Sequence, residues 1–159
     1  MGATNSILAS DLQDNIYISY PYLSWKKEEE MGENKYITEL CTFLKSNIDK
    51  TIIQSKIHTI FSENNLKPPE IHKIMDNIIN QSYYIIVIIT PETIRSIHQA
   101  IEIDHFLEKN KKIVYLMSDI DYTPEINPEL KSVIGKNIWL PFYDEPAVFN
   151  SCKEIKELL

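Results

Sequence analysis

Glycine is scarce in this sequence: 159 residues contain only three, Gly2, Gly32 and Gly135, and they lie far apart. Loops that cradle phosphate groups need clustered glycines, because the backbone must turn tightly and approach the ligand closely. The P-loop and the glycine-rich dinucleotide-binding turn are therefore excluded. The Gly-x-Ser-x-Gly turn of serine hydrolases is also missing.

The chain also has only two cysteines and no excess of positive charge. Cys41 and Cys152 form neither a metal-ligand spacing nor a disulfide framework, so we expect no metal site. Cys41 falls on the apolar stripe of a predicted helix, which indicates a buried free thiol in a reducing compartment. The net charge of −7 argues against a nucleic-acid or anionic-membrane surface. With no membrane-spanning stretch and no secretory signal, we expect a cytoplasmic protein.

Residues 1–14 form a polar N-terminal arm in this interpretation, and residues 15–159 form one domain. The arm begins Met1-Gly2-Ala3-Thr4-Asn5-Ser6, which fits the N-myristoylation pattern, with Gly2 exposed after removal of Met1 and Ser6 at the required place. No polybasic cluster or nearby cysteine supplies a second anchor. Myristate at Gly2 would therefore give only weak, reversible membrane association.

Apolar runs typical of strands alternate with amphipathic patterns typical of helices. The periodicity predicts strands at 16–20, 56–61, 84–89, 113–117 and 138–140, and helices at 37–48, 68–79, 92–109 and 146–159. Thr90 is a candidate N-cap of the third helix, and a polar loop with Pro124 and Pro128 precedes the last strand. This alternation predicts an α/β fold: a flavodoxin-like, doubly wound, five-stranded parallel sheet with helices on both faces.

In such a sheet, function lies where the first and third strands end. The loops there carry Tyr20-Pro21-Tyr22 and Thr90-Pro91-Glu92, and Thr90 stands where a phospho-receiver would need an aspartate. Glu102 follows, about two turns into the next helix. A carboxylate near this rim could stabilise a developing positive charge or accept a proton. It could equally be a solvated helix charge, and the pattern leaves both interpretations open.

Three segments together resemble Toll/interleukin receptor (TIR) domains, from about Asn15 to the C-terminus. Residues 16–20, Ile-Tyr-Ile-Ser-Tyr, are similar to the first-strand signature hydrophobic-Phe-Ile-Ser-Tyr. Residues 78–91 are similar to the family's helix, third strand and Ser-Pro turn. Residues 96–103 match the spacing of the Ser-x-Trp-Cys-x-x-Glu-Leu box, with Ser96 and Glu102 retained.

The resemblance implies a TIR fold and a link to immunity signalling. Some TIR domains cleave NAD+ at the nicotinamide–ribose bond, so the resemblance implies Glu102 as the catalytic residue and NAD+ as a substrate rather than a resident cofactor. The residues expected to contact NAD+ are Ser19, Tyr20, Pro21, Tyr22, Phe61, Thr90 and His98. Among them, His98 lies one turn before Glu102 and could hydrogen-bond it.

The sequence also departs from the TIR pattern. His98 stands at the usual Trp, Gln99 at the usual Cys, and Pro68-Pro69-Glu70 replaces part of a loop that often makes TIR–TIR contacts. Two hypotheses follow. One is an NAD+-cleaving TIR enzyme, a hydrolase or a cyclase; the other is a non-catalytic module, an adaptor or decoy, that binds other TIR domains. The retained Glu102 favours the enzyme, while the lost Trp and the altered loop favour the module.

Overall fold

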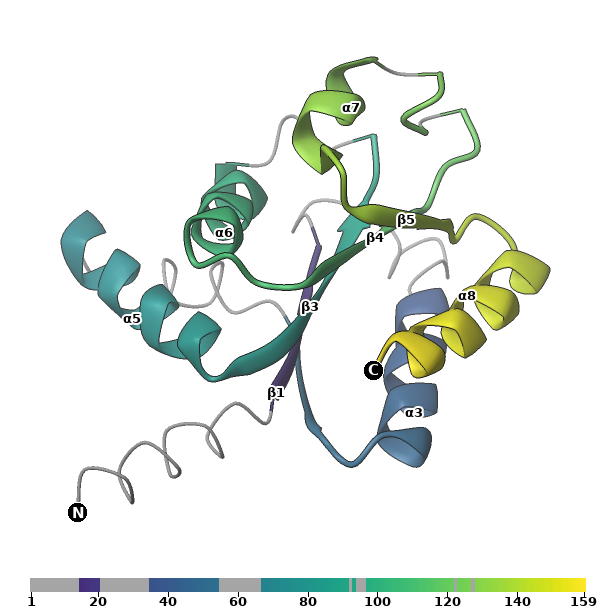
Figure 1. Ribbon diagram of the computed structural model, residues 1–159, viewed down its shortest axis with the longest axis horizontal. Coiled ribbons are helices and arrows are strands. Elements are labelled where there is room, and N and C mark those ends of the chain that lie inside the picture. Colours follow the sequence, from purple (N-terminus) through teal and green to yellow (C-terminus); the bar gives the residue numbers. More distant parts are fainter. Residues whose placement is uncertain are drawn as a thin grey trace.

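A computed structural model of the chain describes residues 15–20, 35–54, 67–91, 93, 97–121, 123–126 and 128–159. The strands are β1 (Asn15–Ser19), β2 (Thr51–Gln54), β3 (Ser82–Ile89), β4 (Ile113–Met117) and β5 (Ile138–Pro141). The helices are α3 (Lys35–Asn47), α5 (Pro68–Asn80), α6 (Ile97–Glu108), α7 (Pro128–Ile134) and α8 (Glu145–Leu158). The elements alternate along the chain as predicted (Figure 1).

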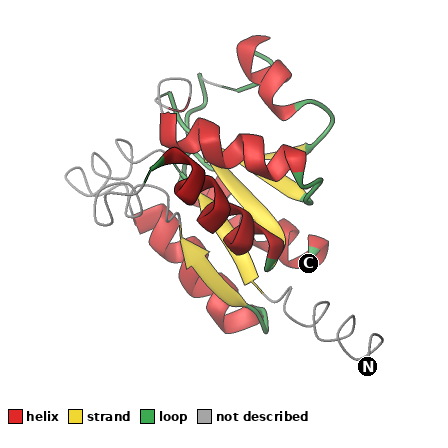
Figure 2. Cartoon of the chain, turned by 90° about the vertical axis from the view of Figure 1, so that its left-hand side faces the viewer, coloured by secondary structure: helices red, strands yellow, loops and turns green. Residues whose placement is uncertain are grey.

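All five strands are parallel, in the order β2-β1-β3-β4-β5. Within β1, Ile16 pairs with Ile52 of β2 on one side and with Tyr84 of β3 on the other. Helices cover both faces of the sheet, as Figure 2 shows from the side. The flavodoxin-like fold is therefore confirmed, and the strand order reverses between β1 and β3, where such sheets bind ligands.

Two cores fill the molecule, one on each face of the sheet. Helices α3 and α8 pack on one face, while α5, α6 and α7 pack on the other. The central strand β3 supplies both cores, because Ile86 and Ile88 point to the first and Ile85, Val87 and Ile89 to the second. Burial of each such side chain contributes about 1.5–3 kcal/mol. This double burial explains why the strand has an unbroken apolar sequence.

The structure contains two elements that the sequence analysis did not predict. Strand β2 lies at Thr51–Gln54, and the strand predicted at 56–61 lies outside the described residues. β2 is an edge strand whose side chains are exposed or half-buried, so its apolar alternation was too weak to find. Helix α7 lies inside the predicted polar loop. It has seven residues, and Leu130 and Ile134, about one turn apart, are buried; a helix this short gives too little periodicity to identify.

The third predicted helix begins later than the sequence suggested. Helix α6 starts at Ile97, so Thr90 is too far upstream to be its N-cap. Thr90 instead closes a turn with Thr93 directly after β3: its backbone N–H donates to the Thr93 hydroxyl at 2.8 Å, and the Thr93 N–H donates to the Thr90 carbonyl at 3.0 Å. Side chain–backbone bonding of this kind competes with helix formation.

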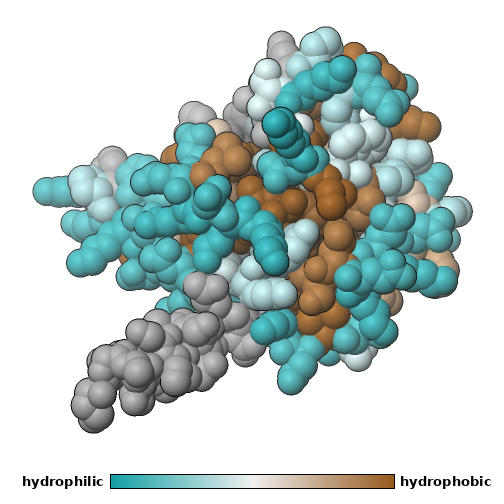
Figure 3. Space-filling view, in the orientation of Figure 1, coloured by the Kyte–Doolittle hydropathy of each residue, from teal (hydrophilic) through white to brown (hydrophobic). Residues whose placement is uncertain are grey.

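The exposed faces of the helices are hydrophilic, while apolar side chains gather between them across the middle of the view in Figure 3. This distribution agrees with the amphipathic patterns that predicted α3, α5 and α8. Among the described residues, no helix is long and apolar enough to cross a membrane.

Both cysteines are free thiols buried in the α3–α8 core, as expected for Cys41. Burial raises the pKa of the Cys152 thiol to about 11, with a smaller contribution from the charge of Glu39. Burial also raises the pKa of Cys41, partly offset by Lys45. Neither thiol is therefore activated as a nucleophile at neutral pH, because the thiolate is the reactive form.

Helix α8 has a side-chain N-cap, and this leads to a stability prediction. The Asp144 carboxylate accepts a hydrogen bond from the Ala147 backbone N–H at 2.8 Å. Asp144→Ala should destabilise the fold by about 1 kcal/mol and lower the melting temperature by about 2–4 °C. Asp144→Asn, which keeps a capping oxygen, should lose clearly less in the same thermal denaturation experiment. Equal losses in the two variants would contradict a capping role.

Candidate active site

The side chain of Glu102 is completely buried, at 0% exposure. Helix α6 presents it to the sheet together with Gln99, Ile103 and Phe106, which are also buried. The alternative of a solvated helix charge is therefore wrong. Removal of a carboxylate from water costs several kcal/mol unless polar partners compensate. Its partners consequently decide what Glu102 is able to do.

Two hydroxyl groups from β1 bind the Glu102 carboxylate. The Tyr17 hydroxyl donates to Oε2, and the Ser19 hydroxyl donates to Oε1 at 2.8 Å. Residues two apart on a strand point to the same face, so Tyr17 and Ser19 both reach the α6 side of the sheet. Hydroxyls that donate to both oxygens stabilise the ionised carboxylate and fix its orientation.

The ring of Tyr17 is itself fixed by packing. It is fully buried and lies edge-on to Phe106, with ring centroids 5.7 Å apart. Phe106 follows Glu102 by one helical turn, so the same helix supplies both the carboxylate and the aromatic contact that orients its partner. The phenol oxygen is thus held at the carboxylate with little rotational freedom.

Gln99 ties the beginning of α6 to the neighbouring strand. Its side-chain amide donates to the Ile88 backbone carbonyl of β3 at 2.9 Å, and the residue is fully buried. Glu102 contacts β1, so the two side chains together attach α6 to both strands beside the switch point. This arrangement places a carboxylate at the position where a doubly wound sheet binds ligands.

The other predicted site residues are placed as follows. Tyr20 lies on the opposite face of the sheet from Glu102, where it packs against the α3–α8 core and its hydroxyl donates to Gln54 Oε1 at 3.2 Å. Thr90 is buried in the turn after β3. Pro21, Tyr22, Phe61 and the side chain of His98 lie outside the described residues. The structure therefore brings Ser19, but not Tyr20, to Glu102.

Two residues of the site were not identified from the sequence. Tyr17 stands where the TIR signature has Phe, and Gln99 stands where its box has Cys. Each substitution places a polar group at a buried position, and that departure was the available signal. Tyr17 and Ser19 share a face by simple alternation, so the pair of hydroxyls could have been found. Among the described residues, no group of three His, Cys, Asp or Glu side chains is placed to hold a metal ion.

The fold and the site define the chain as a TIR-type domain: a flavodoxin-like sheet with a buried glutamate at the switch point, supported from the first strand. Residues 17–122 match the family described as Thoeris protein ThsB, TIR-like domain. The match spans more than half of the chain, from β1 to beyond β4. The protein therefore belongs to the ThsB TIR-like family, and its context is TIR-type immunity signalling.

Solved structures support the same fold. The Clostridium botulinum CMP N-glycosidase BcmB is similar to this chain with a TM-score of 0.55 and 16% sequence identity, over 91% of this chain and 99% of that one. At that identity the likeness shows the shared fold alone. No curated protein matches the sequence.

Proposed function

We propose that this TIR domain cleaves the N-glycosidic bond between nicotinamide and ribose in NAD+, with Glu102 as the catalytic carboxylate. The observation that carries the proposal is the buried carboxylate held by the hydroxyls of Tyr17 and Ser19 at the switch point. A structural helix charge gains nothing from such burial, whereas active sites often contain a charged group kept out of water.

The chemistry needs one negative charge at a defined place. As the bond between ribose C1′ and the nicotinamide nitrogen breaks, its electron pair leaves with nicotinamide, and positive charge develops on the ribose. A carboxylate beside the ribose stabilises that charge or attacks C1′ to form a transient ester. Water then adds at C1′ and loses a proton, which gives ADP-ribose; attack by a hydroxyl or ring nitrogen of the same molecule would give a cyclic product instead.

The structural neighbour adds support for the class of bond. BcmB is a CMP N-glycosidase, so a protein with this fold cleaves the bond between a base and a ribose. The same bond type occurs in NAD+ and in pyrimidine nucleotides. CMP is therefore the second substrate to test, and the family match to a TIR-like domain is the reason for placing NAD+ first.

The proposal is tested by incubation of the purified chain with NAD+ or CMP at high protein concentration, with and without a crowding agent. Release of nicotinamide or cytosine is followed by liquid chromatography. Nicotinamide release above the rate in buffer supports the proposal, and product masses distinguish ADP-ribose from a cyclic form. Cytosine release alone would keep the bond class but replace the substrate.

Absence of both products under all conditions would favour the second hypothesis, a non-catalytic module that binds other TIR domains. One specific observation favours that hypothesis: His98 and Gln99 replace the Trp-Cys pair of the TIR box. Association with TIR domains, including self-association, should then survive substitution of Glu102. Myristate at Gly2 lies outside the described residues and stays a prediction, as do residues 1–14 as a separate arm.

A further inference from the structure

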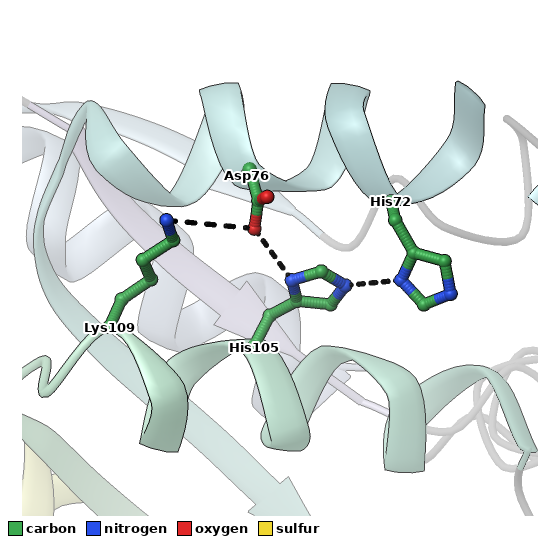
Figure 4. A network of polar contacts seen from close by, with 4 residues as sticks. All are labelled: His72, Asp76, His105 and Lys109. Atoms are coloured by element: carbon green, nitrogen blue, oxygen red, sulfur yellow. Dashed lines mark hydrogen bonds and ion pairs between the residues drawn. The ribbon is translucent and has the colours of Figure 1, made fainter. Parts of the chain in front are cut away.

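A second polar cluster links the two helices on the Glu102 side of the sheet (Figure 4). His105 of α6 lies between two residues of α5: its Nδ1 is 2.8 Å from Asp76 Oδ1, and its Nε2 is 2.8 Å from His72 Nδ1. The two imidazole rings are tilted, with centroids 5.0 Å apart. Asp76, His105 and His72 thus form one continuous chain of hydrogen bonds between α5 and α6.

The buried residue lies in the middle of this chain, and both ends reach the surface: the Asp76 side chain is 37% exposed. His105 is only 6% exposed, whereas His72 is exposed. Lys109, in the turn after α6, lies 4.0 Å from the same Asp76 oxygen. The titratable groups that face His105 among the described residues are therefore His72 and Asp76 from α5, with Lys109 beside the carboxylate. Asp76 accepts a hydrogen bond only when His105 carries a proton on Nδ1.

The number of protons decides whether the two histidines are bonded to each other. With His105 protonated on Nδ1 towards Asp76, its Nε2 accepts a proton donated by a neutral His72. One added proton keeps the link, because a charged His105 then donates from Nε2 to His72 Nδ1. A second added proton breaks it, because both facing nitrogens become donors and both rings become cations.

The position of the chain relates it to the proposed catalytic residue. His105 follows Glu102 by three residues, so the two side chains leave α6 within one turn. Glu102 is bonded to β1, and His105 is bonded to α5. Helix α6 is therefore held from two sides, and the α5 link is the one that depends on protonation.

We propose that the Asp76–His105–His72 chain is a proton-dependent clamp that holds α6, and with it Glu102, against α5, and that acidification opens the clamp. His105 is a positioning residue in this proposal, because the hydrogen bonds described for it go to Asp76 and His72 rather than to Glu102. The part that concerns catalysis rests on the proposed function, but the clamp itself does not.

The clamp is tested by hydrogen exchange of backbone amides in α6, at about pH 7.5 and about pH 5.5, with labelling times scaled for the intrinsic pH dependence of exchange. Loss of one hydrogen bond, worth about 1 kcal/mol, should increase local opening about fivefold. Wild-type protein should therefore lose about fivefold protection in α6 at the lower pH. Amides of α8, on the opposite face of the sheet, should not change.

Two variants at the exposed position 72 complete the test. His72→Asn places an amide near the Nδ1 position that donates to neutral His105 or accepts from charged His105, so α6 protection should stay at the wild-type level of pH 7.5 at both pH values. His72→Phe removes the link and should give low protection at both. The proposal is overturned if wild type and His72→Phe are equally protected at pH 7.5, or if His72→Asn loses protection on acidification as wild type does.

The link to catalysis has its own readout. If NAD+ is turned over, the wild-type rate should fall more steeply towards acid pH than the rate of His72→Asn, while both agree near pH 7.5. Parallel pH profiles for wild type and His72→Asn would show that the clamp does not affect catalysis by Glu102, and would overturn this part of the proposal. If NAD+ is not turned over at all, the proposed function fails, and the exchange experiment still decides the clamp.

Discussion

Glu102→Gln should lower the rate of nicotinamide release at least about a thousandfold. The amide has the size of the carboxylate but no charge, so it cannot balance the positive charge that develops on the ribose. Loss of a single preorganised electrostatic contact costs about 10²–10³ in rate, and loss of an attacking carboxylate costs more. The measurement is single-turnover release of nicotinamide at saturating NAD+, which separates the chemical step from product release.

The substitution should leave the fold intact. The glutamine oxygen still accepts a hydrogen bond from Ser19 or Tyr17, so the fold should lose no more than about 1–3 kcal/mol. This is why Gln is a sharper choice than Ala, which would leave two buried hydroxyls without their acceptor. Glu108→Gln is the matched control, because it removes an exposed carboxylate from the same helix. Activity of Glu102→Gln within tenfold of wild type would exclude Glu102 as the catalytic group.

The fold was predictable because the largest contributions to its stability come from buried apolar residues, whose spacing is visible in the sequence. The unbroken apolar run of β3 is buried on both faces, and β4 lies at the predicted residues 113–117. The edge strand β2 was not predicted, because an edge position buries too little of each side chain to impose an apolar pattern. Helix α7 was missed because a helix of seven residues is too short to give a recognisable apolar period.

The site was only partly predictable, for a different physical reason. Sequence spacing places Glu102 on a helix but does not say which face of the helix meets the sheet. Burial of Glu102 follows from how α6 lies across β1 and β3, which depends on contacts such as Gln99 to the Ile88 carbonyl. The His72–His105 contact joins residues 33 positions apart, and nothing in the local pattern indicates it. Such pairs become visible only when the helices are placed side by side.

Tyr17→Phe should weaken both stability and turnover, although it removes a single oxygen atom. The related TIR signature has Phe at this position, so the ring should keep its packing against Phe106. The lost hydrogen bond to a charged acceptor is worth about 1.5–3 kcal/mol, which lowers the melting temperature of a chain of this size by about 5–10 °C. The rate of nicotinamide release should fall about ten- to a hundredfold, because the carboxylate is less firmly oriented.

A pH profile separates this positioning role from a general loss of stability. The Tyr17 hydroxyl donates to the ionised form of Glu102, so its removal makes that form less favourable. Protonation should then occur at higher pH, and the acid limb of the rate profile should move upward in Tyr17→Phe. In a Glu102→Gln background the same substitution should cost clearly less stability, since it no longer breaks a bond to a charge.

Tyr84→Phe provides the matched control for the missing hydroxyl. Tyr84 lies on β3 as the register partner of Ile16, and its side chain is buried in the core on the opposite face of the sheet from Glu102. Its substitution should leave both the rate of nicotinamide release, within about twofold, and the acid limb unchanged. If Tyr17→Phe and Tyr84→Phe gave the same rate and the same pH profile, the Tyr17 hydroxyl would have no role in orienting the Glu102 carboxylate. A shifted acid limb in Tyr17→Phe alone would instead assign the orientation of the carboxylate to β1, the strand where this chain has Tyr in place of the Phe of the TIR signature.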